Sequence, residues 1–159
     1  MPAAQPAADR RAAEAALRTL VGRHAPAHVR LVAAARKWLR ERLPTAHEIV
    51  YEYRDCFVIS VSPTPQGYEG VFALRGSVSA VQLYFNQGKG LPDPAKLLKG
   101  TGKLVRFLDL ERPSPFANPD VLRLVDAALA RNLLPYPRDG QGSLLIRQTV
   151  AGQRRGSDT

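Results

Sequence analysis

The chain has 159 residues, which is enough for one domain with its own core and leaves little room for a second. Its 23 Lys and Arg residues outnumber 14 Asp and Glu residues, and this favours acidic partners such as nucleic acid, nucleotides or anionic lipid; a solvated basic surface without a specific partner would have the same excess. Because Cys56 is the only cysteine, an intramolecular disulfide is excluded. No signal peptide or membrane-length apolar run is found, so we expect a cytoplasmic protein.

The N-terminal third predicts two basic helices. Residues 1–8 are rich in Ala, Pro and Gln and are expected to be disordered, and a first helix is predicted over residues 9–23 with Asp9 as its N-cap. A second helix is predicted over residues 26–43, because Pro26 suits a first turn and Pro44 prevents continuation. The positions expected to face the core are Ala12, Ala16, Leu17 and Leu20 in the first helix and Leu31, Ala35, Trp38 and Leu39 in the second.

From Glu48 onward the apolar period changes from helical to alternating, which predicts strands. The expected strands cover residues 48–53, 57–62, 70–74, 80–85 and 105–110, with a further segment at 143–149 that pairs at a sheet edge. Short turn-rich links between them indicate an antiparallel meander. We therefore predict an α+β domain over residues 9–150, in which five to six strands pack against N-terminal and C-terminal helices, followed by a polar tail at 151–159.

The C-terminal helix is predicted from local capping chemistry. Asn118 is an N-cap residue, Pro119 suits the first helical position, and Pro135 and Pro137 end the helix. Its apolar stripe comprises Val121, Leu122, Val125, Ala128, Leu129 and Leu133.

The segment from Phe85 to Arg106, FNQGKGLPDPAKLLKGTGKLVR, joins two of the predicted strands and holds four glycines, two prolines and five cations. Asp93 and Pro94 predict a short helix over residues 94–99, with Gly100 as its left-handed stop. The following Gly100-Thr101-Gly102-Lys103 is typical of an anion-binding nest, in which backbone N–H groups, a hydroxyl and an ammonium all donate. It is not a nucleotide P-loop, because its glycines follow a helix instead of preceding one.

This segment resembles the YdhG-like domain family of unknown function, in which the pattern F-x-x-G-x-x-LPDP-x-x-LL-x-G-x-GK-x-VR is typical. The upstream YEYRDCFVISVSPT and the downstream GSLLIRQTVAGQRR are also similar to members, so the resemblance extends over residues 30–155. It implies a compact antiparallel sheet packed against helices. One branch of the family is described as frataxin-like iron chaperones. Phe107 stands where many relatives have His, so no role for that histidine carries over.

Candidate residues for three other functions can be identified in the sequence. An iron site would need gathered carboxylates, and the candidates are Glu48 and Glu52 on one strand face, with His47 beside them, and Asp109 with Glu111. Nucleic acid would stack on the strand aromatics Tyr51, Tyr53, Tyr84 and Phe85. No set of catalytic residues is evident in the sequence. Cys56 has no catalytic partner that the sequence defines and is interpreted as a structural thiol, and the nucleophile motif G-x-S-x-G does not occur.

The sequence therefore predicts a cofactor-free, non-catalytic binding module. Its loop is expected to receive an anionic or phosphorylated ligand through Lys89, Thr101, Gly102, Lys103 and Arg106. The alternatives are an intracellular iron chaperone, a nucleic-acid-binding accessory protein, and a loop whose glycines serve only its own turns. No metal ligands are assigned.

Overall fold

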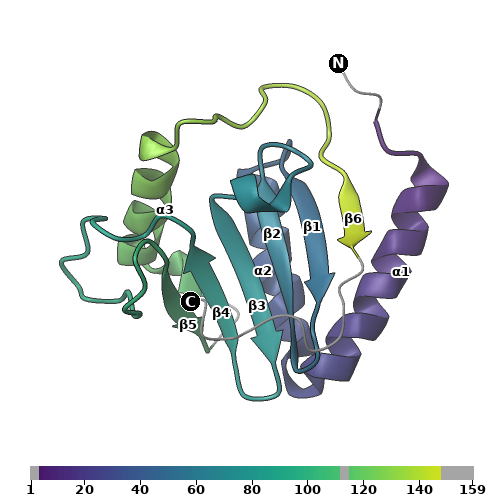
Figure 1. Cartoon of the computed structure of the whole chain (residues 1–159), viewed down its shortest axis with the longest axis horizontal. Coiled ribbons are helices and arrows are strands. Elements are labelled where there is room, and N and C mark those ends of the chain that lie inside the picture. Colours follow the sequence, from purple (N-terminus) through teal and green to yellow (C-terminus); the bar gives the residue numbers. More distant parts are fainter. Residues whose placement is uncertain (1–3, 112–114, 148–159) are drawn as a thin grey trace.

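The computed structural model describes residues 4–111 and 115–147, which form three α-helices, three short 3-10 turns and one six-stranded sheet (Figure 1). The helices are α1 (Ala7–His24), α2 (Val29–Arg42) and α3 (Pro119–Arg131), and the 3-10 turns are η1 (Pro26–His28), η2 (Gly67–Glu69) and η3 (Pro115–Ala117). The strands are β1 (His47–Glu52), β2 (Cys56–Ser62), β3 (Phe72–Ser77), β4 (Val81–Phe85), β5 (Arg106–Leu110) and β6 (Leu144–Arg147). In the described part of the chain, no helix has both the length and the apolar character that a membrane span requires.

The sheet confirms the predicted α+β class and its antiparallel meander. Its strand order is β5-β4-β3-β2-β1-β6, with every neighbouring pair antiparallel except β1 and β6, which are parallel. The last predicted strand does pair at a sheet edge, as expected. Gln148 and Thr149 of that prediction, the predicted tail at 151–159 and residues 1–3 lie outside the described residues.

One hydrophobic core joins all three helices to the sheet. Phe57, Ile59 and Val61 of β2 face this core, as their alternation predicts. On the opposite face η2 folds back over the strands, where the Ser60 hydroxyl donates a 2.6 Å hydrogen bond to the Gly67 carbonyl. Figure 1 shows α2 behind the central strands and η2 in front of them, so both faces of the sheet centre are covered. Cys56 is buried, as the structural interpretation of this thiol expects.

The observed helix boundaries agree with the predicted start of α3 but not with all of the other predicted boundaries. The Asn118 side chain accepts a 2.8 Å hydrogen bond from the Asp120 N–H, which confirms the predicted cap of α3. However, α3 ends at Arg131, and the prediction that Leu133 faces the core is wrong, because its side chain is 98% exposed. The second predicted helix is divided into η1 and α2.

The predicted start and stripe of the first helix are also corrected. α1 begins at Ala7, so Asp9 lies within the first turn and does not cap the helix. Leu17 and Leu20 are buried, whereas Ala12 and Ala16 are exposed. The buried stripe is instead completed by Val21 and His24, because this C-terminal half of α1 is the part that packs on the core.

The predicted helix over residues 94–99 does not form. Lys96 has a φ of +56°, which interrupts any right-handed helix at that position. Asp93 does act as a local acceptor, but its carboxylate bonds the N–H groups of Leu97 and Leu98, both at 2.9 Å, and so closes a turn. Beyond this turn, Lys99 pairs with Phe107 as an isolated β-bridge.

Each edge strand of the sheet is contacted at one residue by another part of the chain. At the β5 edge, Lys99 and Phe107 exchange backbone hydrogen bonds of 2.7 and 3.0 Å. At the β6 edge, the Gln5 amide donates to the Leu144 carbonyl at 2.8 Å and accepts from its N–H at 2.9 Å, in the manner of a strand partner. These contacts reduce the exposed backbone that would otherwise pair with another chain.

Candidate functional site

The predicted anion-binding loop lies between β4 and β5, and a backbone contact brings its two arms together. The Lys89 N–H donates a 2.9 Å hydrogen bond to the Leu104 carbonyl, which places Lys89 beside the segment that carries Lys103. Gly88 permits this approach, because a Cβ at that position would lie 2.6 Å from the Cβ of Arg106. The structure therefore gathers cations from both ends of the loop.

Arg106 stabilises the loop itself. Its Nη1 donates hydrogen bonds of 2.6 Å to the Gly102 carbonyl and 2.7 Å to the Val105 carbonyl, and so holds the turn before β5. Lys99 is likewise engaged, because its ammonium lies 2.5 Å from the Asp109 carboxylate. This contact is the main reason that the pKa of Asp109 is lowered.

The predicted ligand side chains of Lys89, Thr101 and Lys103 have no partner among the described residues, whereas the Gly102 carbonyl is bound by Arg106. The side chains of Lys89, Thr101 and Lys103 are exposed, and none of them forms a hydrogen bond or ion pair with a described residue. Gly100 has a φ of +114°, as expected for a left-handed stop, whereas Gly102 has no positive φ. The loop thus offers a hydroxyl and two ammonium groups beside a turn that Arg106 holds in place.

Three of the four candidate metal-binding carboxylates, Glu48, Glu52 and Asp109, form ion pairs with basic side chains. Glu52 forms an ion pair with Arg23, and its Oε2 lies at a hydrogen-bond distance of 2.7 Å from Nε2 of His24. Glu48 hydrogen-bonds to Arg36. Among the described residues, no group of three or more His, Cys, Asp and Glu side chains is placed to hold a metal ion. The aromatic stacking surface is also reduced, since Tyr84 and Phe85 are buried.

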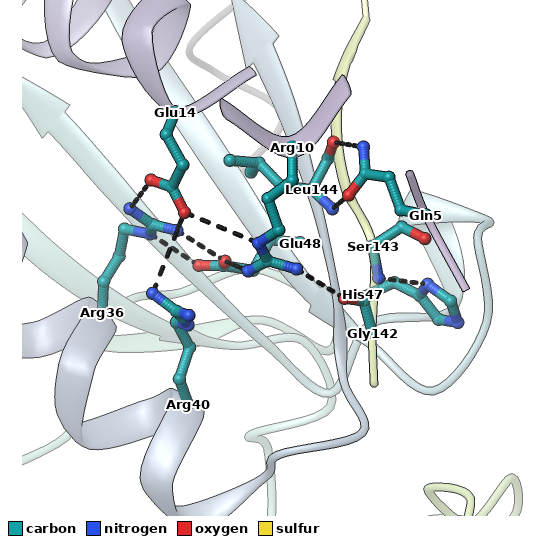
Figure 2. Close-up of polar contacts among 10 residues, drawn as sticks. All are labelled: Gln5, Arg10, Glu14, Arg36, Arg40, His47, Glu48, Gly142, Ser143 and Leu144. Carbon is teal, nitrogen blue, oxygen red and sulfur yellow. Dashed lines mark hydrogen bonds and ion pairs between the residues drawn. The ribbon is translucent and has the colours of Figure 1, made fainter. Parts of the chain in front are cut away.

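A second cluster of charges, which the sequence reasoning did not identify, lies between α1, α2 and β1 (Figure 2). Arg36 is at its centre and donates 2.7 Å hydrogen bonds from Nε and Nη2 to the two carboxylate oxygens of Glu48. It also donates to both oxygens of Glu14, at 2.9 and 3.2 Å. Only 4% of the Glu48 side chain and 13% of the Arg36 side chain are exposed, so this is a buried, bidentate ion pair.

Two further arginines surround this pair. Arg10 on α1 lies 3.8 Å from Glu14 and 3.9 Å from Glu48, and Arg40 on α2 lies 3.9 Å from Glu14. The hydrogen bonds from Arg36 are the main reason that the pKa of Glu14 is lowered. Burial opposes the charge on Arg36 itself, but its hydrogen bonds to Glu48 and Glu14 outweigh this effect and raise its pKa.

The segment that enters β6 closes one side of the cluster. Arg10 donates a 2.7 Å hydrogen bond to the Gly142 carbonyl, and the Ser143 N–H donates to Nδ1 of His47 at 3.0 Å (Figure 2). Burial lowers the pKa of His47. Only glycine fits at 142, because a Cβ there would lie 1.6 Å from the carbonyl oxygen of Ala46.

A cavity of about 750 Å³ opens between this segment and the two helices. Its charged lining consists of Arg10, Arg36, Lys37, Arg40, Glu41 and Glu48, and the remaining lining consists of Ala33, Leu43, Pro44, Ala46, Gly140, Gln141 and Gly142. One residue of this cavity is unusual in the sequence itself. Glu48 lies two residues before Val50, so both point to the same face of β1, and that face packs on the core.

Comparisons with protein-family models, with curated proteins and with solved structures find no match to this chain. The resemblance to YdhG-like proteins therefore stays a prediction from the residues of the loop and its flanks.

Proposed function

We propose that this protein is a non-catalytic, cytoplasmic binding module of the YdhG-like type, and that the loop between β4 and β5 receives an anionic or phosphorylated ligand. The observation that carries the proposal is the set of donors that have no partner in residues 4–111 and 115–147, namely the side chains of Lys89, Thr101 and Lys103. They lie on two arms of a loop that the contact between Lys89 and Leu104 joins.

The chemistry of these groups suits a phosphate or a similar oxyanion. Two ammonium groups supply charge, and the Thr101 hydroxyl supplies a neutral donor to a third oxygen. Each charge-assisted hydrogen bond contributes about 1.5–3 kcal/mol. Arg106 is assigned a positioning role, because it holds the Gly102 and Val105 carbonyls and thereby the turn that carries Lys103.

The test compares ligand-induced stabilisation in two variants of the same loop. Lys103→Ala removes a proposed ligand group, whereas Lys96→Asn removes an equal charge at a position where Asn tolerates the φ of +56°. Melting temperatures are measured with pyrophosphate, polyphosphate and nucleotides. A ligand at 100 times its Kd stabilises by about 2.7 kcal/mol, which raises the Tm of a chain of this size by roughly 5 to 11 °C.

We expect this shift in the wild type and in Lys96→Asn, and its loss in Lys103→Ala, with little change in the unliganded Tm of either variant. The proposal fails if no phosphorylated compound stabilises the wild type. It also fails if Lys103→Ala and Lys89→Ala both retain the full shift.

A further inference from the structure

We infer that the cavity between α1, α2 and the segment that enters β6 is a second binding site, for a small organic acid that carries a single carboxylate on an apolar body. This site is separate from the loop between β4 and β5, because its lining comes from the opposite edge of the sheet. Its uncommitted donors, its charge balance and its shape support this assignment.

The first observation is that the arginine donors are only partly used. Arg36 is fully engaged with Glu48 and Glu14. In contrast, Arg40 makes only the 3.9 Å ion pair with Glu14 and no hydrogen bond to any described residue, although its guanidinium has five N–H groups. Arg10 commits Nη1 to the Gly142 carbonyl, while its other nitrogens approach carboxylates only at 3.8 and 3.9 Å.

The second observation is the charge balance. The four cations of the lining are Arg10, Arg36, Lys37 and Arg40, and the three carboxylates that pair with them are Glu14, Glu41 and Glu48. Four positive and three negative charges leave a surplus of one positive charge. One carboxylate neutralises this surplus, whereas a phosphate monoester with a charge near −2 would reverse it. The planar fork of an arginine also matches the two oxygens of a carboxylate.

The third observation is the shape of the site. A volume of about 750 Å³ is within the range of small-molecule sites, which is about 300–1,000 Å³. Ala33, Leu43, Pro44 and Ala46 supply an apolar wall for the body of the ligand. The backbone of residues 140–142 completes the lining, and Gly140 leaves it open there, because no atom lies within 4 Å of a Cβ built at that position.

The site is also held in position before any ligand arrives. Glu48 and Glu14 fix Arg36, and the Gly142 carbonyl fixes Arg10, so two of the three arginines have defined positions. Arg40, with 45% of its side chain exposed, is the group that is free to turn toward a carboxylate. Rigid support around one adjustable donor reduces the ordering cost of binding.

The experiment is an NMR titration of the ¹⁵N-labelled full chain with acetate, benzoate, cyclohexanecarboxylate and 3-phenylpropionate. Phenyl phosphate and inorganic phosphate provide the matched phosphorylated arm. We expect saturable shifts of the Gln141 and Gly142 amides with the larger carboxylates, weaker effects with acetate, and unchanged amides at residues 100–103. The amides of residues 100–103 report on the loop, and those of Gln141 and Gly142 report on the cavity. The two proposals can therefore fail separately.

Arg40→Gln should weaken carboxylate binding about 10- to 100-fold, as expected for the loss of a charge-assisted hydrogen bond. The control is Arg30→Gln, which changes an exposed arginine of the same helix outside the cavity lining. Its affinity should equal that of the wild type. The inference is overturned if no carboxylate shifts the Gly142 amide, if Arg40→Gln binds as well as Arg30→Gln, or if phenyl phosphate binds more tightly than benzoate.

Discussion

The buried ion pair of Glu48 and Arg36 should make the stability of the protein sensitive to the loss of either charge. Arg36→Met keeps much of the side-chain volume but removes the two 2.7 Å hydrogen bonds to Glu48 and both bonds to Glu14. Glu48 would remain 4% exposed, with Arg10 at 3.9 Å as its remaining ion-pair partner. Leaving one member of a buried pair uncompensated costs about 3–5 kcal/mol, which lowers the Tm by roughly 6 to 20 °C.

Guanidinium chloride unfolding at neutral pH measures this loss, and a double variant supplies the control. Arg36→Met combined with Glu48→Met removes both buried charges, and replacement of a whole buried pair by apolar side chains is often neutral. The double variant should therefore be more stable than Arg36→Met alone. The reasoning is refuted if Arg36→Met costs less than about 1 kcal/mol, which is the range of an exposed pair, or if the double variant recovers nothing.

Three further predictions concern positions outside this pair. Gly142→Ala should destabilise the protein by about 1–3 kcal/mol or more, because the added Cβ would meet the backbone of Ala46. Gly22→Ala should instead stabilise it by about 1 kcal/mol, because no atom lies within 4 Å of an added Cβ in α1. Similar effects of the two substitutions in urea unfolding would contradict this geometry. Asn118→Ala should cost about 1 kcal/mol through loss of the α3 cap, and an unchanged unfolding midpoint would argue against the cap. Burial lowers the pKa of His47 below 6.5, so its contribution to stability is present above pH 6.5 and is lost as the pH falls. His47→Asn should flatten the decline of Tm between about pH 7 and pH 5, and the same slope in both proteins would exclude His47 as its source.

The parts of the fold that were predicted from sequence have local physical causes. Asn118 and Pro119 specify a helix start through one hydrogen bond and one fixed φ, and both act within three residues. The alternation of Phe57, Ile59 and Val61 defines the buried face of β2, because side chains in a strand point to opposite sides in turn. Where alanines carried the pattern, as at Ala12 and Ala16, the hydrophobic signal was too weak to orient the helix.

The arginine cluster could not be predicted in this way. Arg10, Glu14, Arg36 and Glu48 come from three elements, and the contact with Gly142 joins parts of the chain 132 residues apart. In the sequence these charges resemble solvated surface residues, and only Glu48 shares a predicted strand face with a core residue, Val50. Burial decides their role, and burial is a property of the packed molecule. The loop between β4 and β5 shows the opposite case, since its glycines and cations were visible in the sequence while the engagement of Arg106 was not.

A cation of that loop can also act without a ligand, because charged side chains near a sheet edge oppose edge-to-edge association. Lys99, which covers β5 and pairs with Asp109, serves this role directly. Charge reversal separates the two roles at Lys103. Edge protection tolerates either sign of charge, whereas anion binding requires a positive one. Lys103→Glu should therefore keep the oligomeric state of the wild type in light scattering and lose stabilisation by pyrophosphate. A pyrophosphate shift that is unchanged in Lys103→Glu would remove Lys103 from the binding site.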